Sequence, residues 1–175
     1  MTTVERLVHA LAHALKLLLE MDRSQIDPDS RIQAIEGVEY EIGQMDADEL
    51  RHFIDVVDRV ASPGSDVGEY LRDVAEALAG ISEGSGHPGE MSDFNDKVLA
   101  VLLAPCRVLV DLEPPLIDVA AQAAALARLA AEMGRFDSAQ RSEVLAAFAR
   151  REEAEPFDSQ FLARMLAQIG WQSIP

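Results

Sequence analysis

Cysteine is nearly absent from the sequence, because Cys106 is the only one in 175 residues. A lone cysteine excludes an internal disulfide bond and a cysteine-rich zinc site, and it is typical of proteins kept in a reducing compartment. We therefore expect a cytoplasmic protein that is stabilised by its hydrophobic core.

Positive charge is also scarce, with 15 lysines and arginines against 31 aspartates and glutamates and a formal net charge of −16. Nucleic acids and anionic membranes are negatively charged, so either one would meet a repulsive field at this surface. The composition predicts no nucleic-acid partner and no membrane partner, and it favours a partner with a basic surface.

A long uninterrupted hydrophobic run is missing as well. The apolar N-terminal stretch is interrupted by Glu5, Arg6, His9, His13, Lys16 and Glu20. A membrane-spanning helix needs about 20 mainly apolar residues, and a signal peptide needs an unbroken apolar centre. We therefore expect this stretch to be neither.

Aromatic residues make up only 5% of the chain, whereas Ala, Leu, Arg and Glu recur at helical spacing. This composition predicts an all-α protein of about eight helices. In the first half the pattern predicts helices over residues 3–21, 28–43, 47–60 and 66–79. Asp27 before Pro28 and Asp46 three residues before Glu49 are typical helix starts, and Gly43 is a typical left-handed C-terminal cap.

A stretch rich in Gly, Ser and Pro divides the chain near its middle. We predict a four-helix half over residues 1–82, a linker over residues 83–91, and a second four-helix half over residues 92–175.

The apolar and capping pattern of the first half returns in the second half at an offset of 91 residues. Matching pairs include Leu11 with Leu102, Ile26 with Ile117, Gly43 with Gly134, and Asp46 with Asp137. This register predicts an internal duplication, packed as one bundle or as a short stack of α-hairpins. The alternative is that two unrelated amphipathic segments align by chance. Pro105 departs from the pattern and predicts a kink or split in the fifth helix near residue 104.

Residues that could carry chemistry are few, and we expect no catalytic residue, no metal site and no cofactor. Cys106 takes the position of Leu15 at this offset, which predicts a buried core residue. Glu5, His9 and His13 follow one another at intervals of four residues and could hold a divalent metal, but a solvated polar face explains them more simply. A metal-dependent or hydrolytic enzyme is a third interpretation that rests on this row alone.

Acidic charge is concentrated in the first 91 residues, which hold 19 acids and 7 bases, whereas the other 84 hold 12 and 8. Two outer rows are predicted on the third and fourth helices: Asp48, Asp55 and Asp58, and then Glu69, Asp73 and Glu76. Such rows favour rapid capture of a cationic partner. A merely solvated acidic surface is the alternative.

These observations favour a non-catalytic, acidic helical binding protein. The specific hypothesis is a bacterial immunity-type or antitoxin-type inhibitor that occludes a basic protein partner, such as a toxin whose cleft binds an anionic substrate. The alternative is an acidic chaperone or adaptor that binds a secreted effector or a protein complex through apolar grooves between helices. Salt should slow the association of an inhibitor steeply and affect groove binding little.

Overall fold

The computed structural model describes residues 1–61, 64–80 and 91–171. These residues form eight α-helices, one short 3-10 helix and no strand, which confirms the all-α prediction. The helices are α1 (Thr3–Glu20), α2 (Pro28–Ile42), α3 (Ala47–Val60), α4 (Asp66–Ala79), α5 (Met91–Asp111), α6 (Val119–Met133), α7 (Ser138–Ala154) and α8 (Ser159–Gln168), with the 3-10 helix η1 (Pro156–Asp158) between α7 and α8. None of the helices in the described ranges is at once long and apolar enough to cross a membrane.

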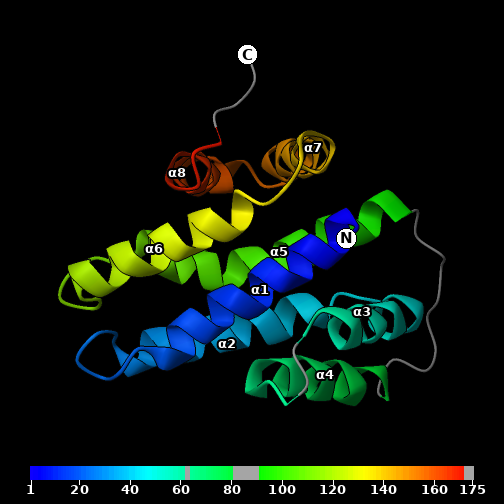
Figure 1. Ribbon diagram of the computed structural model, residues 1–175, viewed down its shortest axis with the longest axis horizontal. Helices are drawn as coiled ribbons and strands as arrows, with labels where there is room; N and C mark the ends of the chain where they lie inside the picture. The colour runs from blue at the N-terminus through cyan, green and yellow to red at the C-terminus, as the bar shows by residue number, and fades with distance from the viewer. Residues whose placement is uncertain (62–63, 81–90, 172–175) are drawn as a thin grey trace.

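Helices α1 and α5 pack against each other through the middle of the molecule (Figure 1). On one side of this central pair lie α2, α3 and α4, and on the other side lie α6, α7 and α8. The second helix of each half packs against the first helix of the other half, since α2 packs on α5 and α6 packs on α1. The two halves are therefore interleaved.

One hydrophobic core joins the two halves. Leu7 and Leu11 of α1 and Leu99 and Leu102 of α5 are almost completely buried in it. Full burial of a leucine side chain stabilises a fold by roughly 1.5–3 kcal/mol. The apolar faces of the two central helices thus account for much of the cohesion between the halves.

The connections between α1 and α2 and between α5 and α6 meet at one end of the molecule. Ile26 and Ile117 form an isolated antiparallel bridge there, and the flanking peptide groups exchange two hydrogen bonds of 2.7 Å each. Both isoleucines are buried in a second, smaller apolar cluster. The two bridged residues lie 91 positions apart, and so do the first residues and the last residues of α2 and α6.

Helix starts follow the capping pattern that the sequence predicts. The Asp27 side chain accepts from the Ser30 N–H at 2.9 Å, directly before Pro28. Asp46 and Glu49 form a reciprocal capping box, in which each side chain accepts from the backbone N–H of the other residue. Each such cap satisfies N–H groups that the helix leaves unpaired, typically contributing about 1 kcal/mol.

The predicted left-handed cap at Gly43 is wrong, because this residue has the right-handed values φ −64° and ψ −13°. Its N–H still donates to the Glu39 carbonyl at 2.9 Å, so the helical turn closes without reversing its hand.

The fifth helix does not split at residue 104, because α5 runs unbroken from Met91 to Asp111 with Pro105 inside it. Proline removes one helical hydrogen bond. The neighbouring Leu102, Leu103 and Cys106 are buried, and their packing holds the helix together through this defect. The predicted linker over residues 83–91 lies outside the described residues except for Met91, which begins α5.

Candidate functional site

All six carboxylates that the sequence predicts to bind a partner are exposed on α3 and α4, which pack against each other (Figure 1). We call these residues the α3/α4 face: Asp48, Asp55 and Asp58 on α3, and Glu69, Asp73 and Glu76 on α4. Residues three and four positions apart share one side of a helix, so the three acids of α4 form a continuous row.

Arg72 joins the two rows of the α3/α4 face. Its guanidinium donates to Asp58 Oδ1 from Nη2 at 2.5 Å and from Nε at 2.8 Å. The hydrogen bonds with Asp58 and its charge raise the pKa of Arg72, and the charges of Glu76 and Glu69 add to this increase. Arg72 therefore lies within a local excess of negative charge that spans both helices.

Four acids of the α3/α4 face form no ion pair with any described residue: Asp55, Glu69, Asp73 and Glu76. The other two acids are paired: Asp48 with Arg51 of the same helix, and Asp58 with Arg72 of α4. The six carboxylates of this face are accompanied by two cations, Arg51 and Arg72, and the charge of Arg72 also acts on Glu69 and Glu76. The face therefore keeps a strongly negative net charge.

The histidine row of α1 is less solvated than the sequence predicts. His9 Nδ1 lies 3.3 Å from Glu132 Oε2 of α6, and its side chain is 38% exposed. Burial lowers the pKa of His13, which is also partly covered. No group of three or more potential metal ligands is found among the described residues. Within this row, His9 contacts α6, whereas Glu5 lies 3.2 Å from Arg59 Nε of α3.

Cys106 is completely buried, as its predicted place in the core requires. Burial in an apolar environment raises the pKa of its thiol, because the thiolate would lose its hydration. The side chain is a small apolar residue of the core rather than a reactive nucleophile.

A groove of about 670 Å³, which sequence reasoning does not predict, lies between α2, α5 and the junction of α7 with η1. We call it the α5 groove. Its apolar part includes Leu103, Ala104 and Val108 of α5, and its charged part includes Arg107 and Asp158.

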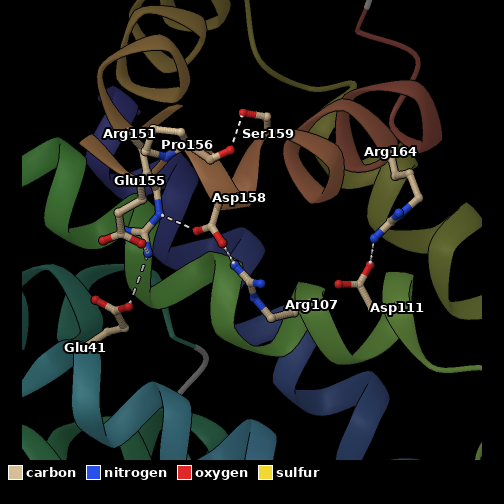
Figure 2. Close-up of polar contacts among 9 residues, drawn as sticks. All are labelled: Glu41, Arg107, Asp111, Arg151, Glu155, Pro156, Asp158, Ser159 and Arg164. Atoms are coloured by element: carbon tan, nitrogen blue, oxygen red, sulfur yellow. Dashed lines mark hydrogen bonds and ion pairs between the residues drawn. The ribbon is translucent and has the colours of Figure 1, made fainter. Parts of the chain in front are cut away.

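Asp158 is the deepest charged group of the α5 groove, with 1% of its side chain exposed. Arg107 Nη2 of α5 donates to Asp158 Oδ1 at 2.5 Å, while Arg151 Nε of α7 lies 3.5 Å from Oδ2. Figure 2 shows the carboxylate between these two guanidinium groups. The Oδ2 atom is buried and has no hydrogen-bond partner among the described residues.

Arg151 extends this cluster to α2. Its Nη2 atom lies 3.5 Å from Glu41 Oε1 and 3.5 Å from Glu155 Oε2 (Figure 2). Burial raises the pKa of Glu41, and the positive charge of Arg151 only partly opposes the effect. Three carboxylates and two guanidinium groups from four elements thus converge on one groove.

A signal for this cluster is present in the sequence at the 91-residue offset. Asp158 takes the position of Val67, which is 5% exposed, and Arg151 takes the position of Val60. A charged residue at a position where the other half has a buried valine indicates a special environment. That environment depends on α2, which comes from the other half of the chain and packs on α5.

A second groove, of about 600 Å³, lies along α1 and the start of α4, and we call it the α1 groove. His13, Lys16, Glu20 and Val67 are among its lining residues. At the 91-residue offset they correspond to Ala104, Arg107, Asp111 and Asp158, all of which line the α5 groove.

Comparison with known proteins finds no family model, no curated protein and no solved structure that matches this chain. The described residues form an acidic all-α bundle with a strongly negative face and an ion-paired groove.

Proposed function

We propose that this protein is a non-catalytic binding protein that captures a protein partner through its acidic α3/α4 face. The observation that carries the proposal is the set of four exposed acids without an ion pair, Asp55, Glu69, Asp73 and Glu76, around the Asp58–Arg72 pair. The partner is expected to present a basic surface. The lone, buried Cys106 fits a reducing cytoplasm, which we propose as the location.

Self-repulsion among these acids opposes folding, so their grouping needs a benefit elsewhere. Complementary charge raises association rates by roughly 10- to 1,000-fold over neutral encounters. Rapid capture is most useful to an inhibitor that must act before its target does damage. We therefore propose an immunity-type or antitoxin-type inhibitor that occludes the basic cleft of a toxin.

The proposal is tested with a partner captured from native lysate and purified. In the face variant, three acids without an ion pair are reversed: Asp55→Lys, Asp73→Lys and Glu76→Lys. We expect its association rate constant to fall at least about tenfold at low salt. In addition, the activity of the isolated partner should disappear when an equimolar amount of the wild-type protein is present.

The matched control carries Glu113→Lys, Glu152→Lys and Glu153→Lys, which changes the net charge equally at exposed positions of the other half. We expect it to slow association less than about threefold, through the weaker long-range field alone. Equal losses in the face and control variants would mean that net charge matters and the α3/α4 face does not.

A chaperone or adaptor is the second candidate function, and the α5 groove favours it. The groove has an apolar floor between helices, which suits a segment of a client protein. In that case the partner would keep its activity when bound, and its association would not depend on the acids of the α3/α4 face.

We also infer that the chain arose by duplication of a four-helix unit. Support comes from α2 and α6, which have the same length and the same Asp and Gly caps, and from the Ile26–Ile117 bridge, all at one offset. Related sequences should then align between their halves at a single offset. Relatives in which the caps and apolar positions follow no common register would contradict this inference.

A further inference from the structure

The α5 groove has the shape of a channel along two helices. The α5 residues that line it recur every three or four positions from Ala100 to Leu112, and the α2 residues do so from Gln33 to Glu41. At 1.5 Å per residue these stretches extend about 18 Å and 12 Å. A groove of this length matches two to three turns of a docked helix.

The floor and the rim of the α5 groove differ in character. The apolar lining comes from the half-buried Ala104 and Val108 of α5 and Leu112 directly after it, together with Ala100 and Leu103, which are almost completely buried. At Gly37 the two helices approach so closely that a Cβ atom would lie 3.2 Å from the Ala104 Cβ. An apolar floor between two closely packed helices suits the apolar side of an amphipathic segment.

The charged groups of this groove are predominantly acidic. Five carboxylates line it, Glu36, Glu41, Asp111, Glu155 and Asp158, against the two lining arginines Arg107 and Arg151, and Asp111 is also paired with Arg164 of α8 at 2.7 Å. Both lining arginines are already engaged by carboxylates of the groove. Glu36 at the rim is exposed and forms no ion pair with any described residue. The charge that is left for a ligand to neutralise is negative.

Asp158 provides a second observation at this groove. Its Oδ2 atom is buried and accepts no hydrogen bond from any described residue, and Arg151 Nε, which lies 3.5 Å away, is likewise buried without a hydrogen-bond partner. A buried acceptor that is left unsatisfied has lost its bonds to water without a replacement, which costs stability. A donor that enters the groove beside Arg151 would remove this cost.

We propose that the α5 groove docks a basic amphipathic helix of a partner protein. The apolar side of this helix covers the floor formed by α5, its lysines or arginines pair with Glu36 and Glu155 at the rim, and one donor reaches Oδ2 of Asp158. The proposal develops the chaperone or adaptor candidate and does not depend on the α3/α4 face.

The α1 groove supplies an internal comparison for this assignment. In the position of Asp158 it has Val67, and in the position of Arg151 it has Val60. It therefore offers no buried acceptor to a donor at that point. The same basic helix should prefer the α5 groove.

The test uses the full chain and a synthetic peptide of about 14 residues, roughly four turns, made of leucine and lysine in an amphipathic helical pattern. Titration calorimetry measures its affinity, and nitrogen-15 NMR reports whether the Gly37 amide shifts. We expect saturable binding with the Gly37 signal affected, and no binding of a matched peptide with glutamate in place of lysine.

Two groove variants and one face variant locate the binding. Glu36→Lys with Glu155→Lys should weaken peptide binding at least about tenfold, and Asp158→Asn should weaken it roughly threefold to tenfold. The control, Asp55→Lys with Asp73→Lys, has the same change in charge on the α3/α4 face and should change affinity less than about twofold. Thermal melting confirms that each variant is folded.

Loss of binding in the groove variants alone supports the proposal. Loss in the face variant alone overturns it while leaving the proposed function of the α3/α4 face intact. Absence of saturable binding, equal effects of all variants, or equal binding of the glutamate peptide would also overturn it.

Discussion

The α5 groove and the α1 groove share lining positions that lie 91 residues apart in the sequence, and their volumes are similar, about 670 and 600 Å³. Their chemistry differs. Asp158 brings a buried carboxylate into the α5 groove, whereas the α1 groove has Val67 at that position. The comparison teaches that the packing of the helices determines where a groove forms. A few side chains, such as Asp158 and Arg151, determine what the groove can bind.

The contrast extends to the cations of the two grooves. Arg107 in the α5 groove bonds to Asp158. The residue 91 positions earlier, Lys16 in the α1 groove, has a side chain that is 62% exposed, and its Nζ lies 3.7 Å from Oε1 of Glu20, one turn away on the same helix. The guanidinium of Arg107 is thus held by a buried carboxylate, whereas the ammonium group of Lys16 forms only an exposed, weak ion pair.

The largest effect is expected when the buried carboxylate is introduced into the α1 groove. Val67→Asp would place a charge at a 5% exposed position that lacks the second cation which Arg151 supplies in the other groove. We expect the free energy of unfolding to fall by about 3 kcal/mol or more. Urea denaturation at neutral pH measures the change, and a loss below about 1 kcal/mol would show that the two grooves are interchangeable.

A smaller loss is expected for the reverse exchange, Asp158→Val. Arg107 has a half-exposed side chain and can return to water, and Arg151 keeps Glu41 and Glu155. We expect a cost of about 1–2 kcal/mol in the same urea experiment. If this variant were destabilised as much as Val67→Asp, the argument that Arg107 can be rehydrated would fail.

Much of the fold can be predicted from the sequence because the signals are local. Apolar spacing predicts about eight helices and locates the four of the first half, and the capping residues Asp27 and Asp46 locate helix starts to within a residue. Pro105 does not split α5, because the loss of one hydrogen bond is a local effect, whereas the burial that keeps the helix continuous there depends on other helices.

The candidate site likewise has a part that local sequence signals predict and a part that they do not. Exposure of the six acids follows from helical periodicity alone, so the α3/α4 face is predictable. The link from Asp58 to Arg72 and the meeting of Glu41 with Arg151 and Asp158 require knowledge of which helices are neighbours. A single sequence does not encode that information in any local pattern.

Acid should affect the α5 groove through Glu41. Its pKa is raised by burial, so the folded state binds the proton more tightly and the ionised carboxylate opposes folding at neutral pH. This penalty is absent below the unfolded-state pKa and is established as pH rises through the folded-state pKa. We expect Glu41→Gln to stabilise the fold at neutral pH by up to about 1 kcal/mol, with no difference near about pH 3.

The control for this experiment is Glu132→Gln, at the corresponding position of α6. Glu132 Oε2 lies 3.3 Å from His9 Nδ1 and 3.1 Å from Arg135 Nη1, so removal of its charge should give no gain at neutral pH. Urea denaturation across the pH range distinguishes the two, and a gain for Glu132→Gln as large as that for Glu41→Gln would remove the contrast between the halves.

The smallest effect is expected at the surface of α3. Arg51→Gln breaks an ion pair with Asp48 in which both side chains are mostly exposed. Exposed pairs contribute little, so we expect a change in stability within about 0.5 kcal/mol. Because the variant also frees Asp48, the partner should associate with it slightly faster, and slower association would contradict the role of this face.

The ionic-strength dependence of the association rate constant between the wild-type protein and its captured partner tests the central claim most directly. If the acids of the α3/α4 face steer a basic partner, this rate constant falls by roughly tenfold or more between low and physiological salt, and the Asp55→Lys, Asp73→Lys, Glu76→Lys variant loses most of that dependence. A rate constant that stays flat with salt in the wild-type protein would contradict capture by charge.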